Sequence, residues 1–255
     1  MRQYRWLRLF GLFLWPCVVY ADTLRVAAAA NMQYAFAALQ RAFEVQSGHR
    51  VLPSYAASGQ LTTQIMHGAP FDVFLSADTD YPAQIERAGL AVQAPQIYAY
   101  GKLVLWTRST QPLPDWSAWL IWLQSTSVRK IAVANPRVAP YGAQAMQVLR
   151  QLNLYPLLRN KLVFGESIAQ TSQYIDTQAV EVGFSAQAIV AAPDRPRAGQ
   201  WIAVPDTLYQ PLAQAVVVLK QGQQTHPMAV AQFLAFLTSN EAGQLLLRYG
   251  YQLPH

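Results

Sequence analysis

After residue 22 the chain switches repeatedly between short apolar runs and segments with helical spacing. The run over 24–29 is typical of a strand, and Phe36, Leu39 and Phe43 then share one face of a helix predicted over 31–46. Gly48 follows as a helix stop. The same alternation predicts strands over 50–55 and 71–76 and helices over 60–67 and 81–88. Short connections between strands and helices indicate an α/β fold with mainly parallel sheets.

A long apolar segment over 96–106, interrupted by Gly101, marks a passage between two lobes. Beyond it the alternation restarts, with strands over 130–134, 161–164 and 180–185 and helices over 142–152 and 167–177. The proline-rich stretch 192–199 is a loop, and an apolar return strand over 213–220 precedes helices over 227–238 and 241–249. We therefore expect one lobe from residues 22–101 with 206–255, a second from 102–205, and two crossover strands between them.

The first 21 residues have the pattern of a secretory signal peptide. Arg2, Arg5 and Arg8 precede an apolar run over 9–20, which is too short to span a bilayer and ends at Ala21. We expect the mature chain to begin at Asp22, which implies export.

Cys17 is the chain's one cysteine and lies within this leader. Its removal excludes disulfides, cysteine nucleophiles and thiolate metal sites from the mature chain. A lipoprotein would need Cys17 as its acylated residue, and the bulky Trp15 and Pro16 before it disfavour that alternative.

The charge balance is mild, because the formal net charge is +6 and three of the positive charges lie in the leader. The remaining basic residues are scattered and are not interleaved with aromatic residues, which argues against a nucleic-acid partner. No later apolar run reaches transmembrane length.

Catalytic signatures are largely missing from the sequence. It has no G-x-S-x-G, H-E-x-x-H, Walker or G-x-G-x-x-G motif. Ser127 and Lys130 match S-x-x-K by spacing, although in a loop that enters a strand. The histidines have no paired spacing. Asp72, Asp78 and Asp80 cluster near one strand end, where they offer an acid, a base or metal ligands, but turn formation and helix capping explain Asp78 and Asp80 equally well.

Four strand-to-helix turns carry small polar or glycine residues, and the carboxyl edge of an open α/β sheet is where ligands bind. These turns contain Asn31, Ser58 with Gly59, Tyr141 with Gly142, and Ser167 with Ile168. Asn31 follows four alanines that end with Ala30 and leave room for close approach of a ligand. Taken singly, such residues are ordinary helix caps.

Together the turns predict an anion site without lysine or arginine. The first N–H groups of a helix lack intrahelical partners and carry the positive end of its dipole. Hydrogen bonds to a charged group contribute about 1.5–3 kcal/mol each. Micromolar to nanomolar affinity requires about 8–12 kcal/mol. Several neutral donors acting together therefore suffice to bind the anion.

The chain resembles the periplasmic molybdate-binding proteins of ATP-driven (ABC) uptake transporters over residues 23–251. The segments that carry the resemblance are "AAAANM", "YAASGQLTTQI", "GAPFDVFLSAD", "YGKLVLW", "NPRVAPYG", "GESIAQ" and "RYGY". The resemblance implies a two-lobed periplasmic-binding-protein fold of the class II type that closes over a tetrahedral oxyanion without catalysis.

The resemblance also assigns ligand donors residue by residue. It places Asn31 where most members have serine, expects the hydroxyl and N–H of Ser58, and matches the N–H groups of Tyr141 and Ile168. Ala186 stands where many members have a ligand tyrosine. Further candidates from the same turns are Ala30, Gly59, Gly142 and Ser167.

The function implied by the resemblance is capture of molybdate, and of tungstate as well, in the periplasm for delivery to an inner-membrane ABC permease. The expected protein is a monomer, not an enzyme, and has no cofactor; molybdenum is bound only as the oxyanion. The alternatives are another ligand such as sulfate, phosphate or chelated iron, or a secreted hydrolase built on Asp72, Asp78 or Ser127.

Overall fold

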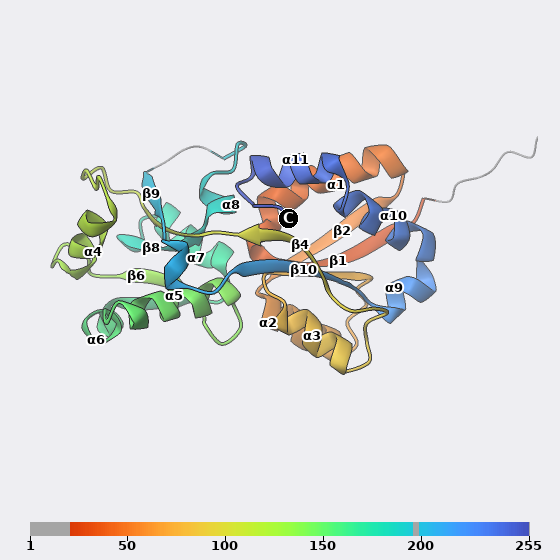
Figure 1. Cartoon of the computed structure of the whole chain (residues 1–255), viewed down its shortest axis with the longest axis horizontal. Coiled ribbons are helices and arrows are strands. Elements are labelled where there is room, and N and C mark those ends of the chain that lie inside the picture. Colours follow the sequence, from red (N-terminus) through yellow and green to blue (C-terminus); the bar gives the residue numbers. More distant parts are fainter. Residues whose placement is uncertain (1–20, 196–198, 255) are drawn as a thin grey trace, which may run out of the picture.

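Two five-stranded sheets of the same design organise the molecule (Figure 1), a computed structural model that describes residues 21–195 and 199–254. The strand orders are β2-β1-β3-β10-β4 and β7-β6-β8-β5-β9. In each sheet one strand, β10 or β5, pairs antiparallel with both of its neighbours, and the first three strands are parallel. The expected two-lobed α/β fold is confirmed, with mixed sheets whose parallel part dominates.

Lobe I contains the first sheet and the helices around it. Its strands are β1 (Thr23–Ala29), β2 (Arg50–Ala56), β3 (Val73–Ser76), β4 (Gln96–Gly101) and β10 (Leu212–Val218). Its helices are η1 (Ala30–Met32), α1 (Gln33–Ser47), α2 (Ser58–Met66), α3 (Asp80–Arg87), α9 (Lys220–Thr225), α10 (Pro227–Leu237) and α11 (Asn240–Arg248).

Lobe II contains the second sheet. Its strands are β5 (Leu103–Thr107), β6 (Ile131–Ala134), β7 (Leu162–Gly165), β8 (Val182–Ala186) and β9 (Gln200–Ala203). The helices are α4 (Trp116–Gln124), α5 (Pro140–Gln151), α6 (Tyr155–Leu158), η2 (Arg159–Lys161), α7 (Ile168–Asp176), α8 (Gln187–Val190) and η3 (Asp206–Leu208).

Side-chain alternation along the strands builds a core on each face of the first sheet. Leu24 and Val26 pack with α1, α10 and α11, whereas Ala27 and Phe74 pack with α2 and α3 on the opposite face. This arrangement follows from the period of two in a strand that is covered on both sides. The helices hold the sheet as a rigid layer, so the strand ends are fixed in space.

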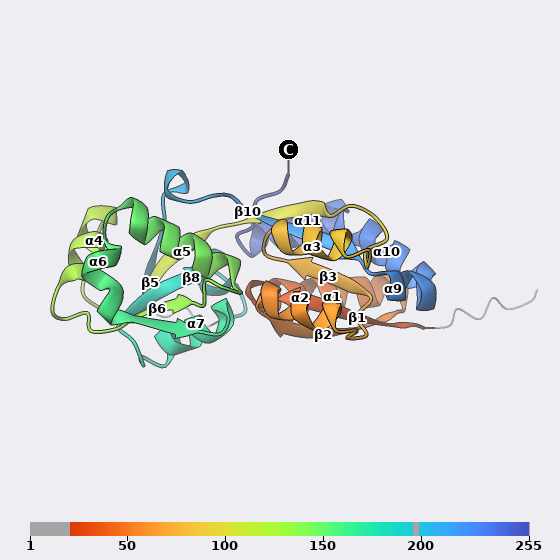
Figure 2. The ribbon, with the colours of Figure 1, turned by 90° about the horizontal axis from the view of Figure 1, so that it is seen from below.

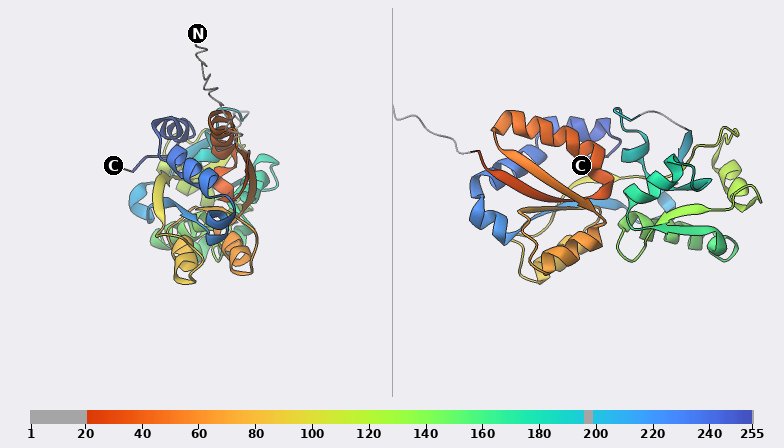
Figure 3. Two further views of the ribbon diagram at one scale, coloured as in Figure 1. Left: turned by 90° about the vertical axis from the view of Figure 1, so that its right-hand side faces the viewer. Right: turned by 180° about the vertical axis from the view of Figure 1, so that it is seen from behind.

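The chain passes between the lobes twice, and Figures 2 and 3 show the lobes side by side along the long axis. The segment predicted as one apolar passage is two strands in different sheets, β4 and β5, divided after Gly101. The second passage runs from β9 through η3 into β10. Leu212 pairs with Gly101, so the two passages meet at one place, the hinge.

Most predicted elements lie where the hydrophobic pattern placed them, within a few residues. The sequence interpretation missed α4, α6, α8, α9 and β9, because these elements are short or, in α4, apolar nearly all round. The expected leader, residues 1–21, lies almost wholly outside the described residues. Within the described part of the chain, no helix is long and apolar enough to cross a membrane.

Candidate functional site

A small cavity of about 10 Å³ lies where the two lobes meet. The starts of η1 and α2 form its lobe I wall, and the starts of α5 and α7 form its lobe II wall. The lining residues are Ala29, Ala30, Asn31, Ala57, Ser58, Ala77, Ala139, Pro140, Tyr141 and Ile168. The structure thus brings together the four main candidates from separate parts of the chain, with Ala30, and none of the lining residues carries a formal charge at neutral pH.

Three of the four helix starts at this cavity lack a side-chain cap at the N-cap residue. The N-cap residues of η1, α2 and α5 are Ala29, Ala57 and Ala139, none of which makes a side-chain cap hydrogen bond. Asn31 and Ser58 lie inside the helical turns, so the interpretation of these two residues as caps is wrong. The N–H groups of the first turns have no intrahelical partner and are buried at the cavity wall.

Ser58 presents a hydroxyl that already accepts one hydrogen bond within lobe I. Its Oγ accepts a hydrogen bond from the N–H of Ala77 at 3.0 Å, and the side chain is fully buried. No acceptor for the hydroxyl hydrogen is found among the described residues, and Ser58 lines the cavity. The hydroxyl can therefore donate to an anion, and the N–H of Ser58 is a first-turn donor of α2.

The side-chain amide of Asn31 is bonded to other residues of lobe I. Its Nδ2 donates to Oε1 of Gln214 and to the hydroxyl of Tyr251, both at 2.8 Å. Both amide hydrogens are used, and Oδ1 is buried without a partner. The donor that Asn31 offers to the cavity is therefore its main-chain N–H.

Lobe II supplies main-chain N–H groups to the cavity wall. Tyr141 and Ile168 lie in the first turns of α5 and α7, where N–H groups have no intrahelical partner. Ser167 is the N-cap of α7, and its Oγ accepts from the N–H of Gln170 at 3.3 Å. A Cβ on Gly142 would collide with the carbonyl of Ala134, so this glycine lets α5 begin directly over the end of β6.

The phenol of Tyr141 is fully buried, and its hydroxyl has no hydrogen-bond partner among the described residues. Burial raises the pKa of Tyr141 well above its ordinary value, and the neighbouring hydroxyls of Tyr251 and Tyr209 add to this effect. Tyr141 is therefore neutral at physiological pH, which keeps the cavity wall uncharged.

Two hydrogen bonds join the lobes beside the cavity. The N–H of Gly59 donates to the carbonyl of Val138 at 2.9 Å, and the hydroxyl of Tyr81 donates to the carbonyl of Arg137 at 3.1 Å. A Cβ on Gly59 would lie 2.6 Å from the Tyr81 hydroxyl, which explains the glycine. Gly59 therefore joins the lobes and does not present its N–H to the cavity.

Other residues considered from the sequence lie in structural settings. Ala186, at the position of the ligand tyrosine in many relatives, is fully buried in the lobe II core and does not line the cavity. Asp72 is buried and accepts from the N–H of Arg25 at 2.6 Å. Asp78 accepts from Ser76 Oγ and from the N–H of Tyr81 in the first turn of α3.

Burial raises the pKa of Asp78 to about 6, and its hydrogen bonds with Ser76 and Tyr81 oppose that shift. Its bonds identify it as a capping residue. Among the described residues, no group of three or more histidine, cysteine or acidic side chains is arranged to hold a metal ion.

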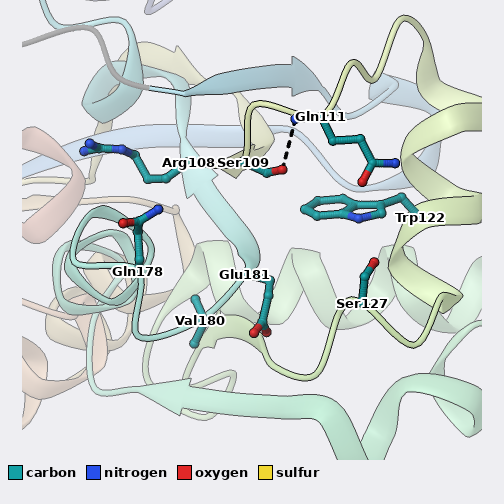
Figure 4. Close-up of a pocket in the computed structure, with 8 residues that line it drawn as sticks. All are labelled: Arg108, Ser109, Gln111, Trp122, Ser127, Gln178, Val180 and Glu181. Carbon is teal, nitrogen blue, oxygen red and sulfur yellow. Dashed lines mark hydrogen bonds between the residues drawn. The ribbon is translucent and has the colours of Figure 1, made fainter.

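A second hollow, of about 300 Å³, lies in lobe II (Figure 4) and contains Ser127. The carboxylate of Glu181 on its wall accepts hydrogen bonds from the N–H groups of Arg129 and Lys130. Arg108 on the same wall is paired with Asp176 at 2.8 Å. Glu181 and Arg108 are thus already paired. Among the described residues the Ser127 Oγ contacts the Oγ of Ser125 and makes no hydrogen bond with a basic side chain.

Sequence reasoning missed several residues that shape the main cavity. Gln214 and Tyr251 hold Asn31, Tyr81 bridges the lobes, and alanines occupy the N-cap positions. The alanines directly before Ser58 and before Pro140 were the available sequence signal, because alanine is a poor N-cap. Gln214 gave the weaker signal of one amide inside an otherwise apolar strand.

The chain forms two α/β lobes, passes between them twice and leaves a small cavity where they meet. This architecture is that of a solute-binding protein. The chain belongs to the bacterial extracellular solute-binding proteins, whose family model matches residues 24–252. The relatives found by comparison are binding proteins of transport systems rather than enzymes.

The individual matches extend over nearly the whole chain. It is 37% identical to the molybdate-binding protein of Azotobacter vinelandii over 95% of each chain. It is 38% identical to that of Rhodobacter capsulatus over 91% of this chain and 88% of the relative. The solved structure of the periplasmic molybdate-binding protein of A. vinelandii superposes with a TM-score of 0.85 at 31% identity, covering 91% of this chain and all of the other.

Proposed function

We propose that this protein captures molybdate, and tungstate as well, in the periplasm and delivers it to an inner-membrane ABC importer. The observation that carries the proposal is the set of helix starts from both lobes that meet at one small, uncharged cavity. The choice of molybdate is supported by two relatives, 37% and 38% identical to this chain, that are molybdate-binding proteins. The protein acts as a monomer after removal of residues 1–21.

The proposed ligand donors are the N–H groups of Asn31, Ser58, Tyr141 and Ile168, together with the hydroxyl of Ser58. Each hydrogen bond to a charged group contributes about 1.5–3 kcal/mol. Five such bonds therefore supply about 7.5–15 kcal/mol, which covers the roughly 8–12 kcal/mol of micromolar to nanomolar binding. Cavity size distinguishes molybdate from sulfate, because both are doubly charged tetrahedral anions with the same acceptors.

Closure follows from the division of donors between the lobes. Asn31 and Ser58 belong to lobe I, and Tyr141 and Ile168 belong to lobe II. A ligand that contacts both walls binds the closed form more tightly than an open one and shifts the population toward it. The importer recognises this closed surface.

Isothermal titration calorimetry of the mature chain tests the proposal. None of the tryptophans of the described chain lines the cavity, so calorimetry reports binding more directly than fluorescence. We expect one site with a micromolar or tighter Kd for molybdate and tungstate, and at least a hundredfold weaker binding of sulfate and phosphate.

Absence of heat and of thermal stabilisation with molybdate and tungstate would remove the proposal. Tighter binding of sulfate or phosphate would keep the anion site and replace the ligand. A ligand at a hundred times its Kd stabilises the folded form by about 2.7 kcal/mol, so a thermal shift gives an independent readout.

A further inference from the structure

Gln214 lies in β10 near the hinge and is fully buried beside the cavity. A register shift divides Gln214 from Ala215: Gln214 pairs with Ala99 and Ala215 pairs with Ile97, so Tyr98 is an extra residue in β4. Such bulges re-aim side chains and are common beside functional sites. Here the irregularity coincides with a polar side chain in an otherwise apolar strand.

The amide of Gln214 is paired at both ends. Its Nε2 donates to the carbonyls of Ala77 at 3.2 Å and Leu212 at 2.8 Å. Its Oε1 accepts from Nδ2 of Asn31 at 2.8 Å. One side chain of the hinge strand is thereby bonded to two segments of the lobe I cavity wall, because Asn31 and Ala77 both line the cavity.

This bonding pattern fixes the orientation of the Asn31 amide. Carbonyl oxygens only accept, so Gln214 must direct Nε2 toward Ala77 and Leu212 and leave Oε1 for Asn31. Tyr251 donates to the carbonyl of Asn31 at 3.2 Å and accepts from Nδ2 of the same residue. Asn31 is thus held by its side chain and its main chain together.

Tyr141 of lobe II also lies beside Gln214. A Cβ on Gly101 would collide with the hydroxyl of Tyr141 and would lie 3.1 Å from Nε2 of Gln214. The Tyr141 phenol therefore packs on the hinge strand next to Gln214. The hinge, the lobe I wall and a lobe II ligand residue share one buried polar cluster: Asn31, Gln214, Tyr251, Tyr141 and Gly101.

We propose that Gln214 is the positioning residue of the site: through its bonds to Asn31 and Ala77 it holds the lobe I wall in the geometry that accepts the oxyanion. Gln214 does not itself touch the ligand. The proposal rests on the proposed function for its affinity readout and has a second readout that needs no ligand.

The test uses Gln214→Met, which keeps an unbranched side chain of similar length and removes the amide. Calorimetry with molybdate is expected to show at least a tenfold weaker Kd. Gln200→Met is the matched control, because the amide of Gln200 is likewise hydrogen-bonded at both ends and lies away from the cavity. Its Oε1 accepts from the Leu113 N–H, and its Nε2 donates to the carbonyls of Ser109 and Gln111. The control is expected to lower Tm and leave Kd unchanged.

A double-mutant cycle with Asn31→Ala separates positioning from general destabilisation. If Gln214 acts through Asn31, the double variant binds as weakly as Asn31→Ala alone. Independent, multiplicative losses, or an unchanged Kd in Gln214→Met, would overturn the proposal.

Hydrogen exchange of the Asn31 side-chain amide, measured by NMR on the ligand-free protein, provides the second readout. We expect slow exchange in the unmodified chain and at least tenfold faster exchange in Gln214→Met. Equal exchange rates would overturn the positioning role even if molybdate binding itself failed. Should Gln214→Met not fold, Tyr251→Phe is the second variant, because it removes the other acceptor of the Asn31 Nδ2 group. We expect a Kd for molybdate weakened about threefold and faster exchange of the Asn31 amide. No change in either quantity would contradict the proposal.

Discussion

Three of the four helix starts at the cavity, those of η1, α2 and α5, differ from the starts of α4 and α11. In α4 the carboxylate of Asp115 accepts from the N–H of Ala118 at 2.8 Å, and in α11 Ser239 accepts from the N–H of Ala242 at 3.2 Å. At the cavity the N-cap positions of η1, α2 and α5 are alanines. The first pair has the capping that a helix needs for stability, and the second group lacks it.

This difference has an energetic meaning. Replacing a good N-cap by alanine costs about 0.5–2 kcal/mol of stability, typically about 1. The three uncapped starts forgo that stabilisation, and the first-turn N–H groups of Asn31, Ser58 and Tyr141 remain available to an anion. The comparison implies that substitutions at α4 and α11 change stability alone, whereas substitutions at the cavity change binding first.

The largest expected effect comes from giving α2 a charged cap. In Ala57→Asp the new carboxylate caps α2 and places a negative charge beside the bound oxyanion. Like charges at such a distance cost several kcal/mol, so we expect molybdate affinity to fall roughly a hundredfold or more by calorimetry. Ala57→Ser is the control, since it caps α2 without charge and should lose much less. Binding by Ala57→Asp at the original affinity would contradict the account.

Ser58→Ala should rank second. It removes one hydrogen bond to the anion, worth about 1.5–3 kcal/mol, which corresponds to a Kd weakened roughly ten- to a hundredfold. The N–H of Ala77 also loses its acceptor, so the apo Tm should fall by a few degrees. A Kd within twofold of the original would exclude Ser58 from the ligand set.

A smaller effect is expected at the bridge between the lobes. Tyr81→Phe removes the hydrogen bond to the Arg137 carbonyl, which exists only when the lobes are closed. A bond of about 0.5–1.5 kcal/mol predicts two- to tenfold faster dissociation in stopped-flow measurements, with little change in the association rate. Tyr155→Phe, in α6 of lobe II, serves as the control. Equal dissociation rates for both variants would show that the Tyr81 bond does not contribute.

The capped helices should show the converse behaviour. Asp115→Ala and Ser239→Ala are each expected to lower the free energy of unfolding by about 1 kcal/mol, measured by urea denaturation. Neither should alter the affinity for molybdate. A change of Kd beyond twofold in either variant would contradict the claim that these two caps contribute to stability and not to ligand binding.

The smallest effect is expected from pH. The lining residues are uncharged, and burial holds the pKa of Tyr141 well above its ordinary value, so no wall group titrates between pH 7 and pH 9. Calorimetry at both ends of this range should give the same Kd within about twofold. A steep fall in affinity within the range would indicate a titrating group that contacts the ligand.

Much of the fold followed from periodicity, because strands covered on both faces and amphipathic helices leave clear patterns. The helix with Phe36, Leu39 and Phe43 on one face is such a case, and its left-handed Gly48 stop was readable as well. The apolar helix α4 could not be predicted from the sequence, because a helix that is hydrophobic nearly all round has no periodic alternation of apolar and polar residues.

The candidate site was predictable only in part. Strand-to-helix turns placed Asn31, Ser58, Tyr141 and Ile168 at the correct sheet edges, because parallel strands end at a common edge. The role of the Asn31 amide was not predictable, since its partners Gln214 and Tyr251 lie 183 and 220 positions away in sequence. Hydrogen bonds over such separations leave no local pattern.

The central claim is that uncharged donors from both lobes hold one oxyanion in the shared cavity. A crystal structure of the mature chain grown with molybdate, with data collected at the molybdenum absorption edge, tests it most directly. The account predicts a single anomalous peak in the cavity, within hydrogen-bonding reach of the Ser58 hydroxyl and of the N–H groups of Tyr141 and Ile168. An empty cavity, or a molybdenum peak elsewhere on the protein, would contradict it.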